Sequence, residues 1–158
     1  MGRTAALEQV RSILWKTEVR LLTLTGPGGV GKTRLAVEAA SSLLHDFADG
    51  VFFVSLAPIQ DPEAVLPAVA ATLAVRESAG KPVAASLADY LRRRDMLLVL
   101  DNFEQVLDAA LPLVDLLKNA PRLKMLVTSR EPLHVYGEHE LSLPPMAVPQ
   151  ACGVTCTE

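Results

Sequence analysis

The segment 26–33 constrains this chain most, because it spells Gly-Pro-Gly-Gly-Val-Gly-Lys-Thr and so fits the pattern G-x-x-x-x-G-K-T. The preceding residues 19–25 are mostly apolar or β-branched, which is typical of a buried strand. After the segment, apolar residues recur at helical spacing, namely Leu35, Ala36, Ala39, Ala40, Leu43 and Leu44. A strand, a glycine-rich loop and a helix in this order predict a loop that binds phosphate.

The chemistry of this loop follows from its residue types. Glycine lets the backbone curl so that successive N–H groups point at an anion, and the helix that begins near Gly31 adds the positive end of its dipole. Lys32 is expected to reach the β- and γ-phosphates, and the Thr33 hydroxyl to ligate Mg²⁺. The alternative is an ordinary glycine turn with an exposed lysine. The predicted nucleotide-binding residues are Gly26, Pro27, Gly28, Gly29, Val30, Gly31, Lys32 and Thr33.

The rest of the chain alternates strands and helices. Further strands are expected over residues 51–56, 96–100, 123–128 and 140–143. Helices are expected to start at Asp61 with Pro62 as first helical residue, to include residues 87–91, and to run from 104 to 119 with a break or kink at Pro112. Strands separated by helices need crossovers, so the sequence predicts the three-layer α/β fold of P-loop NTPases, with a five-stranded, mainly parallel sheet.

Asp101 ends the apolar run 96–100, at the edge where ligands of parallel sheets bind. A buried carboxylate is costly unless its charge is met, and a Mg²⁺ ion beside the phosphates would meet it. Asp101 is therefore the second predicted Mg²⁺ residue, after Thr33. The alternative is that Asp101 caps the following helix, because aspartate is a favoured N-cap residue.

Asn102 and Glu104, which follow Asp101 in the sequence, bear on whether the chain can hydrolyse ATP. Asn102 stands where vigorous ATPases often place a glutamate that activates water, and an amide cannot act as a base. Glu104 is close enough in sequence to substitute, although a solvated glutamate in the first turn of a helix is the simpler interpretation. Hydrolysis is therefore expected to be slow if it occurs, and the chain is at most a slow ATPase.

Arg130 follows the strand expected over residues 123–128. A guanidinium at this strand end could bind the γ-phosphate oxygens and so report whether they are present. The alternative is a surface arginine at the start of a loop. The candidate catalytic residues are therefore Asp101, Arg130 and Glu104.

Composition narrows the function classes. The chain has 158 residues, which suits one domain, and a formal net charge of −3, which argues against this domain gripping a nucleic-acid backbone. Charges interrupt every apolar stretch long enough to span a bilayer, and the N-terminus lacks the pattern of a secretory signal. Cys152 and Cys156 have no further metal ligands in sequence reach, so we expect free thiols in the reducing cytoplasm.

Together these residues resemble the STAND class of P-loop ATPases, close to the NB-ARC domains. Within that class the chain is similar to the ATPase segment of large bacterial transcriptional regulators of the LuxR and AfsR-like types. The phosphate loop alone is shared by very many proteins, whereas a set of motifs in this order is specific. The motifs are Gly2-Arg3, residues 21–36, 50–58, 97–107, 126–133 with the sequence Thr-Ser-Arg-Glu-Pro-Leu, and 141–149.

The resemblance implies roles for particular residues. It places Arg3 beside the adenine, Lys32 and Thr33 at the phosphates and Mg²⁺, Asp101 on the Mg²⁺ side, and Arg130 at the γ-phosphate. It implies a switch that is inactive with ADP and assembles with ATP, driven by a sensory domain elsewhere in a longer chain. The expected cofactors are ATP or ADP and Mg²⁺, and the expected partners are sensor and effector domains, with neither a membrane nor a nucleic acid for this domain.

The chain departs from the family pattern at its ends. Such ATPases continue into a helical subdomain and a winged helix, whereas residues 150–158 have no apolar periodicity. Met1 also stands directly before Gly2, where a few more residues are usual. We therefore expect residues 1–149 to form an NB-ARC-like or AAA-like core, and residues 150–158 to be an irregular tail from a truncated or frame-shifted reading of a larger gene.

Two other function classes stay open. A small P-loop phosphotransferase would have a similar length and loop, although no candidate arginine-bearing lid follows the strand over residues 123–128. A truncated remnant without useful activity is the other class. Outside the site, Trp15 is expected to pack within the first helix, and His45, His134 and His139 to lie on the surface.

Overall fold

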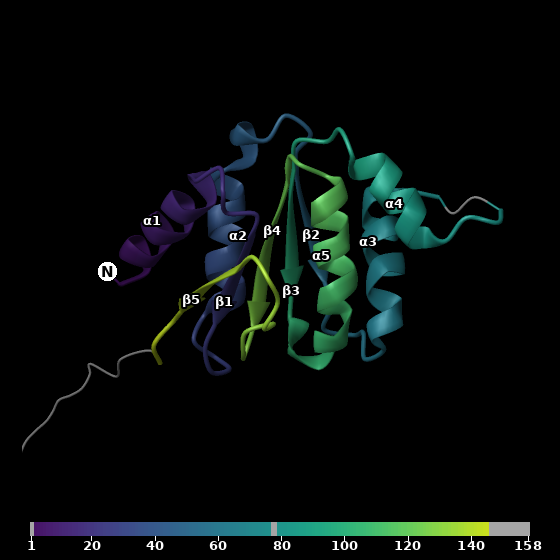
Figure 1. Ribbon diagram of the computed structural model, residues 1–158. Coiled ribbons are helices and arrows are strands. Elements are labelled where there is room, and N and C mark those ends of the chain that lie inside the picture. The colour runs from purple at the N-terminus through teal and green to yellow at the C-terminus, as the bar shows by residue number, and fades with distance from the viewer. Residues whose placement is uncertain (1, 77–78, 146–158) are drawn as a thin grey trace, which may run out of the picture.

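The computed structural model describes residues 2–76 and 79–145, with the backbone alone for residues 2 and 3. Within these residues, parallel strands form one five-stranded sheet in the order β2-β3-β4-β1-β5 (Figure 1). The strands are β1 (Leu21–Thr25), β2 (Val51–Ser55), β3 (Met96–Asp101), β4 (Leu123–Ser129) and β5 (Glu138–Ser142). The expected five-stranded α/β sheet is confirmed.

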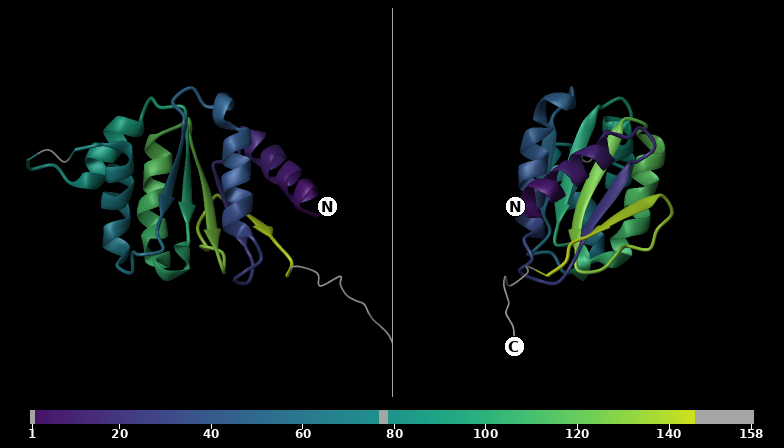
Figure 2. Two further views of the ribbon diagram at one scale, coloured as in Figure 1. Left: turned by 180° about the vertical axis from the view of Figure 1, so that it is seen from behind. Right: turned by 90° about the vertical axis from the view of Figure 1, so that its left-hand side faces the viewer.

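Helices cover both faces of this sheet, which gives the three expected layers (Figure 2). One face carries α1 (Gly2–Trp15) and α2 (Lys32–Ser42). The other face carries α3 (Val65–Leu73), α4 (Val83–Leu91) and α5 (Ala110–Asn119). The 3₁₀ turn η1 (Leu44–Asp46) follows α2.

The sequence of β3 explains why the protein has an apolar core on each side of the sheet. Met96, Leu98 and Leu100 belong to the apolar cluster under α3, α4 and α5, whereas Leu97 and Val99 belong to the cluster under α1 and α2. All five side chains are fully buried. A strand covered on both faces needs such a continuous apolar run, so β3 lies in the interior of the sheet.

The helix expected to start at Asp61 begins as a 3₁₀ turn, η2 (Pro62–Ala64), which leads directly into α3. The Asp61 carboxylate accepts a hydrogen bond from the N–H of Glu63 at 2.9 Å. Asp61 is therefore the N-cap, with proline at the next position, as predicted.

The prediction of a helix over residues 104–119 is wrong for the first half of this range. Two 3₁₀ turns, η3 (Phe103–Gln105) and η4 (Leu107–Ala109), come first, and α5 begins only at Ala110. Pro112 then falls in the first turn of α5, where a missing N–H costs no hydrogen bond. The helix therefore runs through Pro112 without a break.

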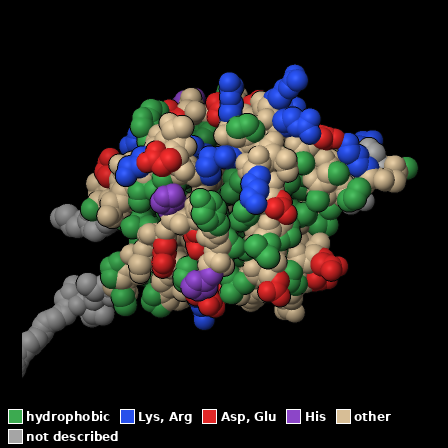
Figure 3. Space-filling model, viewed as in Figure 1, with side chains coloured by type: hydrophobic (Ala, Val, Ile, Leu, Met, Phe, Trp, Pro, Cys, Tyr) green, Lys and Arg blue, Asp and Glu red, His purple; other side chains and the backbone are tan. Residues whose placement is uncertain are grey.

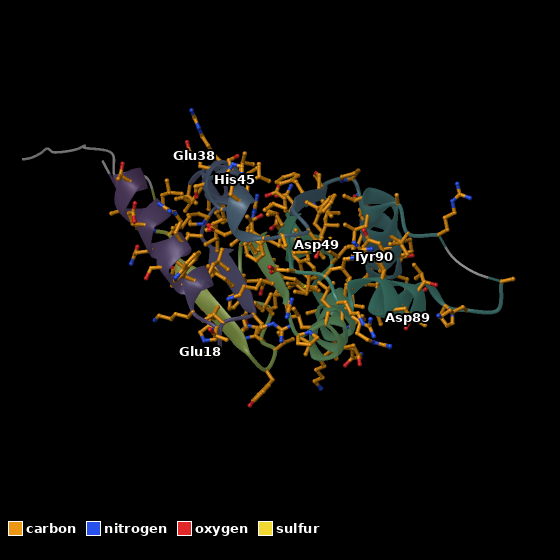
Figure 4. All side chains as sticks on the ribbon, turned by 90° about the horizontal axis from the view of Figure 1, so that it is seen from above. Glu18, Glu38, His45, Asp49, Asp89 and Tyr90 are labelled. Carbon is orange, nitrogen blue, oxygen red and sulfur yellow. The ribbon has the colours of Figure 1, made fainter. Side chains whose placement is uncertain are left out.

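The expectation for Trp15 is also wrong. Trp15 is the last residue of α1 and is 69 % exposed, while Val10 and Leu14 pack against the sheet. His45, His134 and His139 are exposed, as expected, and His45 lies near the end of α2 in Figure 4. In the part of the chain that the structure describes, no helix has the length and apolar character needed to cross a membrane.

Two half-buried cations, Arg20 and Lys124, donate hydrogen bonds to backbone carbonyls near the edge of the sheet where the strands begin. Arg20 donates hydrogen bonds to the carbonyls of Leu117, Ala120 and Leu123, at the end of α5 and just beyond it. Lys124 Nζ donates to the carbonyls of Leu14 and Lys16, at 2.6 Å each. Burial lowers the pKa of both side chains below the ordinary values. Lys and Arg gather along this upper edge in Figure 3.

Several expectations lie outside the described residues. They concern the irregular tail over residues 150–158, the two cysteines within it, the last residues of the family resemblance from 146 on, and the Arg3 side chain.

Candidate functional site

The carboxyl ends of β1, β3 and β4 meet at one edge of the sheet, the lower edge in Figure 1. The register pairs Thr25 of β1 with Ser129 of β4, and Leu100 of β3 with Val127 of β4. β1 lies between β4 and β5 in the sheet. The connection from β1 to β2 and the connection from β4 to β5 therefore cross the sheet in opposite directions. Ligands of open parallel sheets bind in the crevice at such a point.

The loop between β1 and α2 depends on its glycines. Gly29 has φ +80° and Gly31, the residue before α2, has φ +93°, in the left-handed region that favours glycine. Gly26 (φ +153°) passes so close to the residues after β5 that a Cβ there would lie 2.8 Å from the Leu143 carbonyl oxygen. The Leu143 N–H also donates to the Thr25 carbonyl at 2.8 Å. The start of the loop therefore packs closely against Leu143, the residue after β5.

The Lys32 ammonium lies against the backbone of this loop. Its Nζ donates to the carbonyl of Gly26 at 2.8 Å and to that of Pro27 at 3.1 Å. Burial lowers the pKa of Lys32 below its ordinary value; the negative charge of Glu104 opposes this shift and the positive charge of Arg130 adds to it. The Lys32 ammonium is thus held against two carbonyl oxygens of the loop.

The Asp101 carboxylate is 6 % exposed and lies next to two hydroxyl groups. Its Oδ1 atom is 2.8 Å from Thr33 Oγ1 and 2.6 Å from Thr128 Oγ1, and both hydroxyls donate to it. The alternative role of Asp101 as a helix N-cap is wrong, because Asn102, with φ +68°, is the residue that precedes η3. Asp101 instead joins the end of β3 to the start of α2.

These oxygens suit a hard divalent cation. Mg²⁺ at nucleotide sites is held by one or two protein groups together with phosphate oxygens, and Thr33 beside Asp101 offers such a pair. Among the described residues, no group of three or more His, Cys, Asp or Glu side chains could hold a metal ion by itself. The residues present therefore fit Mg²⁺ that arrives with a nucleotide.

Arg130 comes directly after β4 and lies over the loop. Its Nη2 is 3.1 Å from the position that a Cβ on Gly28 would take. The Arg130 N–H donates to Glu104 Oε1 at 3.3 Å. Glu104 lies in the first turn of η3, as the simpler interpretation expected, but it is half-buried and not fully solvated.

Most of these residues line one open cavity of about 580 Å³ at this edge. Gly28, Gly29, Gly31, Lys32, Thr33, Glu104 and Arg130 were expected at the nucleotide site, and Asn102 was noted for its bearing on hydrolysis, whereas Arg34 was not singled out by the sequence. The cavity residues are Gly28, Gly29, Gly31, Lys32, Thr33, Arg34, Asn102, Glu104 and Arg130.

Sequence reasoning also missed hydrogen bonds at this edge of the sheet that involve polar groups outside the cavity lining. The N–H of Asn102 donates to Thr128 Oγ1 at 2.9 Å, and Thr25 Oγ1 donates to Glu140 Oε2 at 2.6 Å. A hydroxyl residue near the carboxyl end of a buried strand was the available signal for Thr128. Its use depends on β4 being the neighbour of β3, which no local pattern reveals.

The sequence matches one family model and several known proteins. The family model of the NB-ARC domain matches residues 3–141. The chain is 43 % identical over 130 residues to a Mycobacterium tuberculosis protein named as a candidate HTH-type transcriptional regulator, covering 82 % of this chain and 14 % of that protein. It is 33 % identical over 162 aligned positions to the regulatory protein AfsR of Streptomyces griseus, covering 95 % of this chain and 16 % of AfsR.

A third relative, an uncharacterized protein of Mycobacterium tuberculosis, is 36 % identical over 149 residues, which is 94 % of this chain and 37 % of that protein. The chain therefore spans between 14 % and 37 % of the length of these curated relatives.

Solved structures share the fold at low sequence identity. The chain is similar to Cdc6p of Pyrobaculum aerophilum, with TM-score 0.61, 22 % identity, and coverage of 82 % of this chain and 39 % of that one. It is similar to a chain of Drosophila ORC bound to DNA, with TM-score 0.72, 15 % identity, and coverage of 93 % and 43 %. The ORC2 protein of Aeropyrum pernix, solved as ADPNP–ADP complexes, gives TM-score 0.62, 15 % identity, and coverage of 94 % and 48 %.

Proposed function

Because this chain belongs to the NB-ARC domain family, we propose that it binds ATP and ADP with Mg²⁺ and acts as the nucleotide switch of a longer regulatory protein. One observation carries this proposal: the Asp101 carboxylate accepts a hydrogen bond from Thr33, which lies in the first turn of α2 directly after the glycine-rich loop and lines the same cavity as Lys32. A loop cation, a loop hydroxyl and an acidic strand end are the groups that a Mg²⁺–nucleotide complex needs.

Each group would contribute in its own way. The loop N–H groups and the N-terminus of α2 would bind phosphate oxygens, and Lys32 would exchange its carbonyl partners for the β- and γ-phosphates. Thr33 and Asp101 would hold Mg²⁺, which supplies positive charge that neutralises the phosphate oxygens. Arg130 would contact the γ-phosphate, which only ATP has.

Hydrolysis would be slow. Asn102, directly after Asp101, offers an amide, which cannot accept a proton from water at neutral pH. Glu104 is the nearest acidic alternative, but its Oε1 accepts from the N–H of Arg130, which holds it at the wall of the cavity. A nucleotide state that persists is what a switch requires.

The remaining parts of the switch would belong to other segments of a longer protein. Relatives named as regulators are several times longer than this chain, which supports sensor and effector domains elsewhere. The similar fold of the ORC2 protein in its ADPNP–ADP complexes supports a site that takes both nucleotide states. ATP-dependent self-association and a cytoplasmic location complete the proposal.

Asp101→Asn tests the Mg²⁺ part of this function. The amide keeps the shape and an acceptor for the two hydroxyls but loses the charge, so the gain in ATP affinity on adding Mg²⁺ should fall about tenfold, or about 1.4 kcal/mol. Affinity in EDTA should stay within about twofold. Isothermal titration calorimetry with and without Mg²⁺ measures both quantities.

The matched control for this variant is Asp115→Asn, which removes the charge of an exposed carboxylate on α5. It should leave both affinities unchanged. A less stable Asp101→Asn protein with the same Mg²⁺ dependence as wild type would assign Asp101 a structural role only.

Arg130→Ala tests discrimination between the two nucleotides. ATP affinity should fall about tenfold while ADP affinity stays within about twofold, because the guanidinium gains charge-assisted hydrogen bonds only from a γ-phosphate. A ligand can shift a two-state protein only by its difference in affinity for the states, so the variant should also respond less to ATP. Titrations of ATP and ADP against both proteins give the ratio.

Arg122→Ala is the control, because Arg122 is an exposed arginine at the opposite end of β4. Equal losses for ATP and ADP in Arg130→Ala would make Arg130 a structural residue. Brisk multiple turnover by the wild-type chain would contradict the slow rate and point to Glu104 as a base.

A further inference from the structure

A buried hydroxyl behind the Asp101 carboxylate has no part in the function proposed above. Thr128 is fully buried near the carboxyl end of β4. Its Oγ1 accepts a hydrogen bond from the Asn102 N–H at 2.9 Å and donates one to Asp101 Oδ1 at 2.6 Å. We propose that Thr128 is a positioning residue: it orients the Asp101 carboxylate, and through it the Thr33 hydroxyl, for the Mg²⁺–nucleotide complex.

The directions of these hydrogen bonds follow from the groups involved. The Asn102 N–H can only donate, so Thr128 Oγ1 accepts from it. An ionised carboxylate can only accept, so the single hydroxyl hydrogen of Thr128 points at Asp101 Oδ1. The backbone at Asn102 thus determines the orientation of the hydroxyl that holds Asp101.

The same carboxylate oxygen orients Thr33. Because Asp101 Oδ1 accepts, Thr33 Oγ1 donates its hydrogen across their 2.8 Å separation. The lone pairs of the Thr33 hydroxyl then stay available to a cation on the side of the cavity that Thr33 lines. If the Asp101 carboxylate were free to rotate, the hydroxyl hydrogen of Thr33 would lose its fixed acceptor. The lone pairs of Thr33 Oγ1 would then no longer point in a fixed direction.

Asn102 contributes through its backbone. It adopts a left-handed conformation (φ +68°, ψ +55°), which asparagine tolerates better than most residues. This sharp turn directs its N–H at β4, where Thr128 accepts it. Asn102 therefore has a structural part in the site that is separate from the chemistry of its amide side chain.

This inference rests on the proposed function, because it presupposes that nucleotide binds with Mg²⁺. Its test compares Thr128→Ala with Thr128→Ser, two variants that differ from each other by one hydroxyl group. Thr128→Ala should lose about tenfold of the Mg²⁺-dependent gain in ATP affinity, and Thr128→Ser should keep the gain to within about twofold. In EDTA, both variants should bind ATP as wild type does. Isothermal titration calorimetry measures all of these affinities.

Thr23→Val is the matched control. Thr23 is a fully buried threonine of β1, the neighbour of β4, and its hydroxyl has no hydrogen-bond partner in the described part of the structure. Removing this hydroxyl should leave the Mg²⁺-dependent gain unchanged. The control therefore separates the loss of a buried hydroxyl in the sheet from the loss of the one that orients Asp101.

Three results would overturn the proposal. Thr128→Ala could keep the full Mg²⁺-dependent gain, or lose it no more than Thr128→Ser does, in which case the hydroxyl does not act through Asp101. Thr128→Ala could fail to fold while Thr128→Ser folds, which would make the hydroxyl a structural group. A wild-type chain that binds no nucleotide refutes the proposed function itself, whereas a gain lost in Asp101→Asn but kept in Thr128→Ala refutes this inference alone.

Discussion

Replacing Lys32 by alanine is expected to weaken the binding of both ATP and ADP by at least about tenfold, or about 1.4 kcal/mol. Lys32 Nζ lies against the carbonyls of Gly26 and Pro27, and no other flexible cation of the described residues belongs to the loop itself. Alanine removes this charge without disturbing the start of α2, because alanine is the best helix former. Isothermal titration calorimetry with Mg²⁺ present measures the loss.

The control is Lys118→Ala, in which the lost lysine is exposed and lies in the last turn of α5. Its affinities should equal those of the wild type. A folded Lys32→Ala protein with unchanged affinity for ATP and ADP would remove the loop from the proposed nucleotide site.

Gly26→Ala is expected to lower the free energy of unfolding by roughly 2–3 kcal/mol, which corresponds to a fall in Tm of about 5–10 °C. The new Cβ would lie 2.8 Å from the Leu143 carbonyl oxygen, a backbone atom that cannot rotate away. Either the phosphate loop or the residues after β5 must move, so nucleotide affinity should fall as well. Thermal denaturation followed by circular dichroism gives the change in Tm.

Gly137→Ala provides the comparison for this variant. Gly137 also has a positive φ, +85°, but a Cβ there would meet nothing within 4 Å. Its cost should be limited to backbone strain of about 1 kcal/mol. If Gly26→Ala destabilises the protein no more than Gly137→Ala does, the loop and the end of β5 are not packed as closely as described.

The interior of the sheet could be predicted from the sequence, because a parallel strand covered on both faces must be a continuous apolar run. The run over residues 96–100 and the β3 strand (Met96–Asp101) differ only by Asp101. The edge strand β5 (Glu138–Ser142) was harder to locate, and the predicted start at residue 140 is two residues late. Its side chains are half-buried or exposed, so no apolar pattern marks its beginning.

The region before α5 was predicted wrongly for a related reason. Phe103, Val106 and Ala109 are buried and recur every three residues, a spacing that fits one face of an α-helix as well as successive 3₁₀ turns. Periodicity alone cannot separate the two. The structure settles the matter, since the left-handed turn at Asn102 leads into 3₁₀ turns.

Some residues of the candidate site could be selected from the sequence and others could not. Lys32 and Thr33 belong to a local motif, and Asp101 and Arg130 follow apolar runs, so sequence reasoning could select all four; their roles remain predictions. Thr128 could not be selected, because its link to Asp101 depends on which strands are neighbours. That information comes only from tertiary structure.

The position of β1 in the sheet has a consequence for the biosynthesis of this domain. Both neighbours of β1, β4 and β5, come from the last third of the chain, so the phosphate loop leaves the ribosome long before the strands that support it. Pairing between distant segments forms late and slowly. The contact between Gly26 and Leu143 can form only after β5 has been synthesised. The glycine-rich loop therefore gains its neighbours in the sheet only after β4 and β5 have been synthesised.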